Sequence, residues 1–315
     1  MDTTSRHSPT SAGPLPHRHR FRMQDYAVLL KPRVMSLVVF TAACGLFLAP
    51  GTIGLETALV AIICIAAGAG AAGAINMWYD QDIDRVMQRT MNRPIPAGRM
   101  RPVEALVFGT LLSFGAVGIM AKWVNAPAAL LLAVTILYYV FIYTMWLKRR
   151  TPQNIVIGGA SGAFPPMIGW IAVTGGMDWG AISLFAIIFL WTPPHSWALA
   201  LYRRGDYAAA DVPMMPVVAG ERHTKFLMLV YTALLIPATL APVALGVSGA
   251  FYGLAALGLG IEFWRRLWRV WKSDDVMTAR PLFLCVRVCM CVYVVCMCAC
   301  VCILVSLLFV CVCVC

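Results

Sequence analysis

Two carboxylates and one amide recur at a spacing of four residues where the second long apolar run ends. They are Asn76, Asp80 and Asp84. Positions four apart on an α-helix differ in direction by only about 40°, so these side chains are predicted to share one face. Carboxylate and amide oxygens are typical ligands of hard divalent cations. The spacing therefore predicts a metal site at a membrane edge, where ionisable groups are expensive and usually functional.

Basic side chains follow this stripe directly. They are Arg85, Arg89, Arg93, Arg99 and Arg101. Guanidinium groups bind phosphate oxygens through paired hydrogen bonds. Acidic ligands for a metal beside basic ligands for phosphate indicate a site for a diphosphate compound at a membrane surface.

Two further segments carry residues that could bind phosphate. The segment KPRV places Lys31 and Arg33 at the start of the first apolar run, and YTMWLKRRTPQN places Tyr143, Lys148 and Asn154 around a turn between two later runs. The alternative is that such basic residues anchor the chain to anionic lipid.

A second acidic segment, YRRGDYAAADVP, follows the sixth apolar run. Asp206 lies four residues after Tyr202, whereas Asp211 lies five residues further on and points about 140° away on a helix. Asp206 is therefore the stronger candidate for a metal ligand, and the role of Asp211 stays open. The alternative for both is a solvated carboxylate neutralised by Arg203 and Arg204.

Two proline pairs interrupt apolar runs. Pro165 and Pro166 predict a broken helix that lines a pocket, because proline leaves backbone groups that need other partners. Pro193 and Pro194 precede His195. A lone histidine is more often a core residue than a ligand, but this one lies shortly before the second acidic segment, which favours a function.

The composition is that of an integral membrane protein. The chain has 315 residues, 61% hydrophobic and 12% charged, with a mean hydropathy of +0.78. An all-α polytopic fold of about nine transmembrane helices is predicted from its long apolar runs. They span residues 34–50, 55–76, 103–121, 127–147, 153–173, 179–199, 224–244, 249–268 and 282–314.

The net charge of +11 follows the membrane topology and does not indicate nucleic-acid binding. Of the 25 Lys and Arg, all but Lys122 and Arg287 lie before the first run or near the loops that face the same side. This asymmetry predicts that the amino terminus is cytoplasmic, or on the matrix side in an organelle.

The two ends of the chain differ from its centre. Residues 1–25 have no apolar signal segment and are predicted to be a disordered leader, with a mitochondrial presequence as the weaker alternative. Residues 284–315 alternate Cys and Val, which is typical of a low-complexity tail that either forms the ninth helix or is a sequence artefact. Residues 26–283 form the predicted membrane domain.

The motifs together resemble one family. In the order of the chain, KPRV, NxxxDxxxD, RTxxRPxPxGR, YTxxLKRRTPxNIVIGG, AFPPMIGW, LWTPPHxWALAL and GDYxxAxVPMxPVV are similar to those of the protohaem IX farnesyltransferases of the UbiA superfamily. The resemblance covers about 31–283. It implies a ring of helices around a central cavity in the bacterial inner membrane, and farnesyl transfer from farnesyl diphosphate to haem b, which gives haem O.

The resemblance also implies roles for the candidate residues. Asp80, Asp84 and Asp206 would hold Mg²⁺ with help from Asn76. Diphosphate would be bound by Arg33 of KPRV, Arg93 of RTxxRPxPxGR and Lys148 of YTxxLKRRTPxNIVIGG, with Tyr143 and Asn154 as further substrate contacts. His195 would contact haem as an axial ligand, or by positioning the propionates or the reacting water.

Membrane lipid is an expected partner, as are haem A synthase and terminal oxidase assembly factors.

Two other interpretations stay open from the residues alone. A related enzyme that prenylates an aromatic acceptor such as hydroxybenzoate would share the acidic stripe. A transporter would share the proline-interrupted helices but would not need two acidic loops beside basic clusters.

Overall fold

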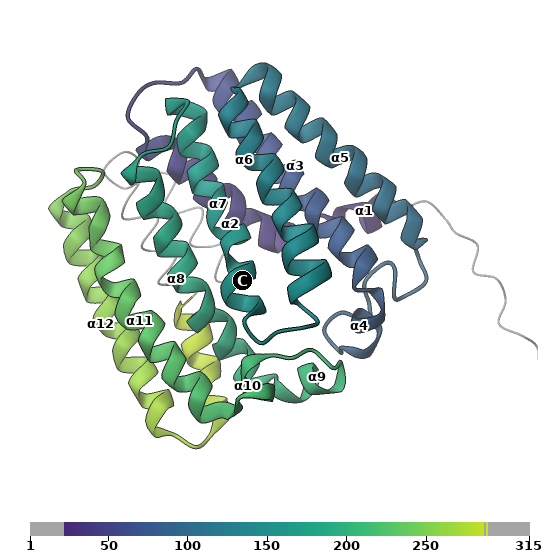
Figure 1. Cartoon of the computed structure of the whole chain (residues 1–315), viewed down its shortest axis with the longest axis vertical. Coiled ribbons are helices and arrows are strands. Elements are labelled where there is room, and N and C mark those ends of the chain that lie inside the picture. The colour runs from purple at the N-terminus through teal and green to yellow at the C-terminus, as the bar shows by residue number, and fades with distance from the viewer. Residues whose placement is uncertain (1–21, 287, 289–315) are drawn as a thin grey trace, which may run out of the picture.

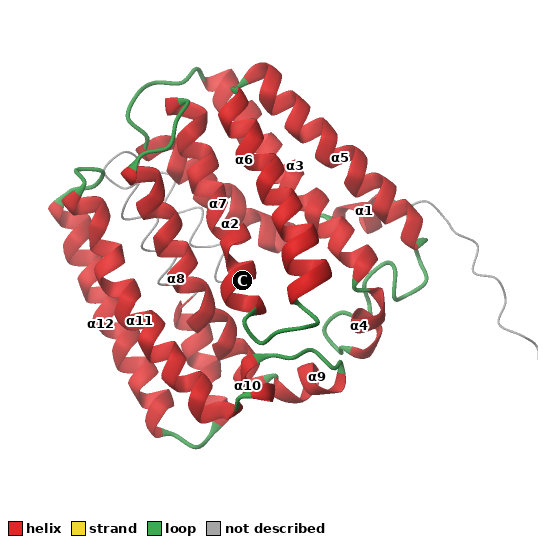
Figure 2. Cartoon of the chain, in the orientation of Figure 1, coloured by secondary structure: helices red, strands yellow, loops and turns green. Residues whose placement is uncertain are grey.

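The computed structural model describes residues 22–286 and 288, which contain helices and loops but no β-strand (Figure 2). The all-α fold predicted from the sequence is confirmed. Figure 1 shows a bundle of long helices, with the short helices α4, α9 and α10 at one end. The elements are α1 (Met23–Leu29), α2 (Pro32–Leu48), α3 (Leu55–Tyr79), α4 (Gln81–Val86), α5 (Pro102–Trp123), α6 (Ala126–Leu137), η1 (Tyr138–Leu147), α7 (Asn154–Thr174), α8 (Trp179–Tyr202), α9 (Arg204–Ala209), α10 (Met215–Val218), α11 (Gly220–Ala244), α12 (Ala250–Lys272) and η2 (Val276–Thr278).

Six helices of the described chain are long and apolar enough to cross a membrane, or seven if the bent pair α1–α2 is one span. The predicted number of nine is therefore not confirmed. The eighth predicted span corresponds to α12, whose second half carries Glu262 and several basic residues that lower its hydropathy. The ninth, 282–314, is described only in part, where it belongs to a short apolar helix, Val276–Val286.

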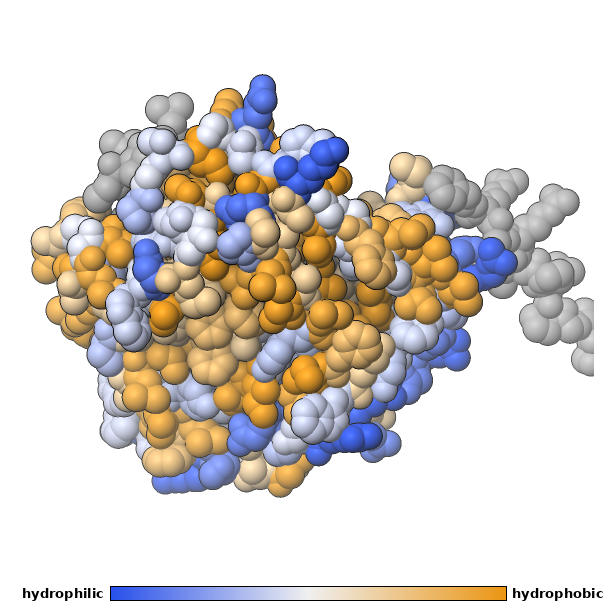
Figure 3. Space-filling view, turned by 45° about the horizontal axis from the view of Figure 1, so that its top comes forward, coloured by the Kyte–Doolittle hydropathy of each residue, from blue (hydrophilic) through white to orange (hydrophobic). Residues whose placement is uncertain are grey.

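The bundle surface is suited to lipid. Large apolar side chains such as Leu111, Phe114, Leu130 and Leu254 are each at least two-thirds exposed. Hydrophobic side chains cover much of the face in Figure 3, and hydrophilic ones gather mostly towards its margins. Exposed apolar side chains are more favourable against lipid hydrocarbon than against water, so this surface is that of a membrane protein.

The end of the predicted leader belongs to the fold. Met23 begins α1, and Asp25 is buried with its Oδ1 atom 2.9 Å from Arg99 Nε. This ion pair ties α1 to the loop before α5. Residues 1–21 of the leader, and nearly all of the 284–315 tail, lie outside the described residues.

The first span bends by 53° between α1 and α2. At the bend Lys31 has a φ angle of 51°, in the left-handed region. The following Pro32 disfavours the helical conformation in the residue before it and is well suited to start α2. Gly70 and Gly73 of α3 face the bend, and a Cβ atom on Gly70 would lie 2.7 Å from Leu30 Cδ2. The small residues of α3 thus leave room for the bend.

The helices α2 and α7 cross at very short distance. A Cβ atom on Gly45 would overlap the backbone oxygen of Pro166, and one on Gly169 would overlap the backbone oxygen of Ala42. Small residues permit such direct backbone contact between membrane helices. This crossing closes the bundle between α2 and α7.

The prediction that Pro165 and Pro166 break their helix is wrong. Both lie inside α7, which continues from Asn154 to Thr174. The helix packs against α2, α6 and α8. Proline still removes the backbone partners of the carbonyls of Ser161 and Gly162. The segment nevertheless lines a cavity, because Pro165 and these two residues all border it.

Candidate active site

The acidic stripe lies at the joint between α3 and α4. Backbone hydrogen bonds of 2.9 Å from Asp80 N to Asn76 O and from Asp84 N to Asp80 O keep helical spacing across the joint. All three side chains are buried. Their spacing of four therefore keeps them on one side of the chain, as the sequence predicts.

Each buried carboxylate has a basic partner from a distant segment. Asp80 Oδ2 accepts hydrogen bonds from Lys148 Nζ and, at 2.6 Å, from Asn76 Nδ2. Asp84 Oδ2 lies 2.7 Å from Arg93 Nη1. Burying an unpaired carboxylate would be costly, so these contacts stabilise the two charges in the described structure.

A polar cavity of about 160 Å³, the polar chamber, lies beside the stripe. It lies at the ends of α3 and η1 and at the start of α7. The segment that contains and follows α4, and the segment around the end of α9, complete its wall. Its lining consists of Lys31, Asn76, Asp84, Met87, Arg89, Thr90, Arg93, Tyr139, Tyr143, Lys148, Asn154, Ile155, Tyr207, Val212 and Met214.

Most of the predicted site residues meet here. Those in the lining are Asn76, Asp84, Arg93, Tyr143, Lys148 and Asn154. Asp80 lies behind the lining and is joined to it by Lys148 and Asn76. Residues far apart in the sequence are thus brought together, which the sequence motifs could only suggest.

Asp206 does not line the polar chamber. Its Oδ2 atom lies 3.5 Å from Arg203 Nη1. The next residue, Tyr207, lines the chamber in its place, because one residue along α9 turns the side chain by about 100°. Asp211 is exposed, with a φ angle of 51°. A metal-binding role for Asp206 stays a prediction that this geometry does not support.

Arg33 and His195 also lie outside the lining. Arg33 is exposed in the first turn of α2. The ring of His195 is stacked between Trp191 and Phe283, with ring centroids 4.2 Å and 4.5 Å away. The histidine thus belongs to an aromatic stack between α8 and the helix Val276–Val286, and its predicted contact with haem stays a prediction.

Several lining residues were missed as site residues. Lys31 belongs to the KPRV segment, but no site role was predicted for it beyond possible phosphate binding, and its Nζ atom donates to Asn76 Oδ1 at 2.8 Å. Tyr139 lies four residues before Tyr143, and their ring centroids are 5.3 Å apart. The spacing of the two tyrosines was a signal that could have been used. The position of Lys31 was not predictable, because it depends on the bend between α1 and α2.

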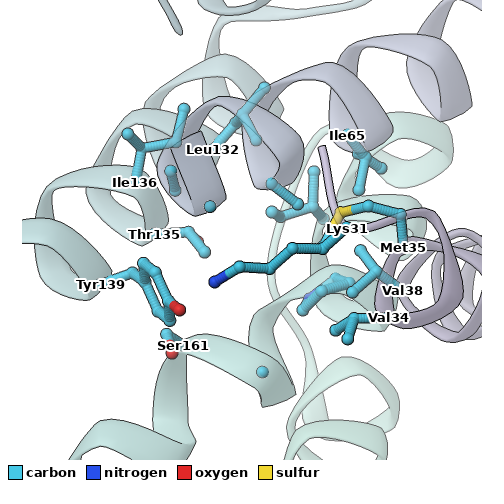
Figure 4. Close-up of a pocket in the computed structure, with 16 residues that line it drawn as sticks. Lys31, Val34, Met35, Val38, Ile65, Leu132, Thr135, Ile136, Tyr139 and Ser161 are labelled. Atoms are coloured by element: carbon cyan, nitrogen blue, oxygen red, sulfur yellow. The ribbon is translucent and has the colours of Figure 1, made fainter. Parts of the chain in front are cut away.

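A second cavity, the apolar chamber, adjoins the polar one and shares Lys31 and Tyr139 with it. Figure 4 shows the stem of Lys31 crossing this cavity, with its amine on the side of Tyr139. Apart from Lys31, the lining comes from α2, α3, α6, η1 and α7. It consists of Lys31, Val34, Met35, Val38, Ile65, Ala69, Ala72, Gly73, Leu132, Thr135, Ile136, Tyr139, Ser161, Gly162, Pro165 and Ile168.

An ion pair outside the chambers fixes α4 to the end of η1. Both Nη atoms of Arg149 lie 2.7 Å from carboxylate oxygens of Asp82. The hydrogen bonds from Arg149 lower the pKa of Asp82. A carboxyl with a lowered pKa contributes stability above its ordinary pKa and loses it as the pH falls through the lowered value. This pair is therefore complete at neutral pH.

The residues around the stripe fit a hard cation. In the described chain no three His, Cys, Asp or Glu side chains form a ready cluster for a metal. However, Asp80 and Asp84 lie one helical turn apart, and the buried Asp80 Oδ1 accepts no hydrogen bond from any described residue, although it lies 3.6 Å from Arg149 Nη2. Two carboxylates and the Asn76 amide are the oxygen donors that Mg²⁺ prefers.

The fold and the site are those of a polytopic membrane protein whose adjoining polar and apolar chambers suit an amphiphilic compound with an anionic head and an apolar tail. The head would lie among cations and the tail in the adjoining chamber. A sequence model described as the UbiA prenyltransferase family matches residues 38–288. The chain belongs to this family and is a prenyltransferase.

Relatives and solved structures agree with this assignment. The chain is 56% identical over 264 residues to a protein of Brucella ovis named "Protoheme IX farnesyltransferase", covering 82% of this chain and 85% of that one. A protein of the same name from Parvibaculum lavamentivorans is 58% identical over 251 residues, covering 80% and 79%. The resemblance found in the sequence motifs is confirmed.

The fold likeness extends to more distant proteins. A structure of digeranylgeranylglyceryl phosphate synthase has a TM-score of 0.74 and 17% identity, covering 87% of this chain and 96% of that one. A UbiA homologue from Archaeoglobus fulgidus, described as bound to GPP and Mg²⁺, has a TM-score of 0.65 and 14% identity, covering 87% and 99%. At these identities the likeness concerns the fold.

Proposed function

We propose that this chain transfers a farnesyl group from farnesyl diphosphate to a vinyl group of protohaem IX (haem b) and produces haem O. The observation that carries the proposal is the junction of the two chambers at Lys31 and Tyr139. A prenyl diphosphate has its reactive carbon at the boundary between charged head and apolar tail. Its head fits the polar chamber and its tail the apolar chamber, while the identity to the farnesyltransferases named above points to the acceptor.

The residues around the polar chamber favour ionisation of the donor. Breaking the bond between C1 and the diphosphate oxygen leaves an allylic cation and moves the electron pair onto the diphosphate. Lys31, Arg93 and Lys148 stabilise that growing negative charge. Mg²⁺, held by Asp80 and Asp84 with Asn76 assisting, would supply further positive charge to the leaving group.

The apolar chamber protects the cation, because its walls exclude water. The ring of Tyr139 borders both chambers and is suited to stabilise the positive carbon. The acceptor vinyl group supplies the electron pair for the new bond to C1. Water then adds to the vinyl carbon that has become positive and loses a proton, which gives the hydroxyethylfarnesyl side chain.

The chain would act in the bacterial inner membrane with its amino terminus cytoplasmic, since the basic loops lie on one side. Asp206 as a further metal ligand, Arg33 as a diphosphate ligand and His195 as a haem contact belong to the proposal as its untested parts. Haem A synthase is the expected recipient of the product.

The direct test is the conversion of haem in membranes that contain this chain. Cells without haem O would express it, and extracted haem would be analysed by mass spectrometry. We expect haem b to gain one farnesyl group and one hydroxyl group. A prenylated phenolic acid would assign the aromatic acceptor, and the absence of any prenylated product would contradict the proposal.

The metal and the acidic stripe are tested with a matched pair on α4. We expect Asp84→Asn to lower turnover about 100-fold or more, because it removes a carboxylate that would hold Mg²⁺ at the leaving group. Asp82→Asn should stay within a few-fold of the parent, because Asp82 faces Arg149 outside the chambers. Chelation should stop turnover and Mg²⁺ should restore it. Equal loss in the two variants would contradict the assignment.

A further inference from the structure

We propose that the apolar chamber measures the length of the prenyl donor, and that a floor formed by Val38, Ile65, Leu132 and Ile168 limits it to three isoprene units. The inference rests on the proposed function, because it takes a prenyl diphosphate as the ligand. It adds the residues that select among prenyl diphosphates of different length.

Four helical segments line the apolar chamber from its junction with the polar chamber to its far end. They belong to α2, α3, α7 and the continuous stretch of α6 and η1. Along α2, Val38 follows Lys31 by seven residues, and along α6 and η1, Leu132 precedes Tyr139 by seven. Seven helical residues span about 10 Å. Ile65 on α3 and Ile168 on α7 are the lining residues furthest from the polar end of their helices. By their positions along the helices, these four side chains are the deepest of the lining.

One helical turn beyond the floor, each of the four helices carries a buried alanine. These are Ala42, Ala61, Ala128 and Ala172. Small side chains let helices pack closely, so the chamber ends where the larger side chains end. The large residues of the floor thus stand directly above a tightly packed layer.

The crossing of α2 and α7 closes the same level from the side. Gly45 and Gly169 leave no space for a Cβ atom against the opposite backbone. Both lie within two turns beyond Val38 and Ile168 on their own helices. A tail that passed the floor would have to separate two helices in direct backbone contact.

The length of the chamber matches a farnesyl chain. An extended chain advances about 3.5 Å per three main-chain bonds, so an isoprene unit with four such bonds advances about 4.7 Å. With the first unit at Lys31 and Tyr139, the two remaining units span about 9 Å, close to the depth of about 10 Å. A fourth unit would need almost one more helical turn, which the alanine layer fills.

The test measures donor binding, so that it does not depend on the acceptor. Geranyl, farnesyl and geranylgeranyl diphosphate are titrated with Mg²⁺ onto the full chain in detergent. Losing or adding a single methylene in a hydrophobic pocket changes selectivity about tenfold or more. We expect farnesyl diphosphate to bind at least tenfold more tightly than geranylgeranyl diphosphate.

Two variants should shift this preference in opposite directions. Leu132→Ala opens the floor and should lower the preference for farnesyl over geranylgeranyl diphosphate about tenfold. Gly162→Leu should favour geranyl diphosphate, because a Cβ atom at Gly162 meets no atom within 4 Å and a side chain there would extend into the chamber. Leu131→Ala is the control, since Leu131 lies on the same helix outside the lining.

The outcomes separate this inference from the proposed function. Equal binding of all three donors by the parent chain, or an unchanged order in both variants, would overturn the floor as the limit. Because Gly162→Leu fills space and Leu132→Ala removes it, instability of one variant leaves the other as a test. Farnesyl-selective binding without haem prenylation would contradict only the acceptor.

Discussion

At the scale of residues, the site is built from charges that neutralise one another in the described structure. Lys148 pairs with Asp80, and Arg93 pairs with Asp84. When a metal ion and a diphosphate bind, each of these side chains can exchange its present partner for a new one of the same charge. Carboxylates can turn to the metal while cations turn to phosphate oxygens, so binding of the head group need not leave a buried charge unpaired.

Lys31 stands apart from these pairs, because its backbone is strained. A left-handed φ of 51° in a residue other than glycine costs on the order of 1–3 kcal/mol and tends to persist at functional sites. The amine contributes to holding it, through the 2.8 Å contact with Asn76. The strained residue is thus one of the two residues shared by both chambers.

We expect Lys31→Met to weaken binding of farnesyl diphosphate at least about tenfold, because it removes a charge-assisted contact worth about 1.5–3 kcal/mol. Arg33→Gln should have the smaller effect, since the exposed Arg33 lies outside both linings. Titration of farnesyl diphosphate with Mg²⁺ measures both. A larger effect at Arg33 would restore it as the diphosphate ligand predicted from the sequence.

At the scale of elements, the π-helical turns of η1 orient the site. A π-helix places hydrogen-bonded residues five apart, as in the 2.9 Å bond from Lys148 N to Tyr143 O. Tyr139, Tyr143 and Lys148 thereby face the chambers together. Gly158 of α7 supports this arrangement, because a Cβ atom there would overlap the ring of Tyr143.

Gly158→Ala should displace Tyr143 and lower turnover about tenfold or more, since small misplacements in an active site are costly. Gly115→Ala makes the same chemical change in the membrane helix α5, where a Cβ atom meets nothing within 4 Å, and should leave turnover unchanged. Rates of haem prenylation measure both. Parent-like turnover in Gly158→Ala would show that the ring position is unimportant.

At the scale of the whole molecule, stability and the chamber walls depend on the same helix crossings. Direct contact between α2 and α7 needs Gly45 and Gly169, and α3 approaches α5 through Gly109, where a Cβ atom would lie 2.9 Å from Ala71 O. In a membrane, such packing replaces the hydrophobic effect as the main attraction between helices. The bundle that encloses the ligand is therefore sensitive to added volume.

Gly45→Val should destabilise the bundle by about 1–3 kcal/mol or more, because overpacking forces helices apart. Gly118→Val on α5 should have little effect, since a Cβ atom there meets nothing within 4 Å. Unfolding in mixed detergent micelles gives both free energies. Equal stability of the two variants would show that the crossing relaxes easily.

Much of this protein was predictable from patterns within single helices. Apolar runs identify membrane helices because the hydrocarbon core requires them. The spacing of Asn76, Asp80 and Asp84 places them together, because helical geometry is local. The number of membrane spans was less predictable. The predicted nine spans are not confirmed, because the charged residues of α12 lower its hydropathy and the end of the chain is described only in part.

The sequence by itself thus determined the class of fold, the acidic stripe and the family motifs. Only the tertiary structure decided that Lys31 and Tyr207 line the polar chamber while Arg33 and Asp206 do not. The physical reason is that the direction in which these side chains point depends on the bend after α1 and on the turn before α9. Such irregular joints are held by contacts with distant helices, which no local pattern contains.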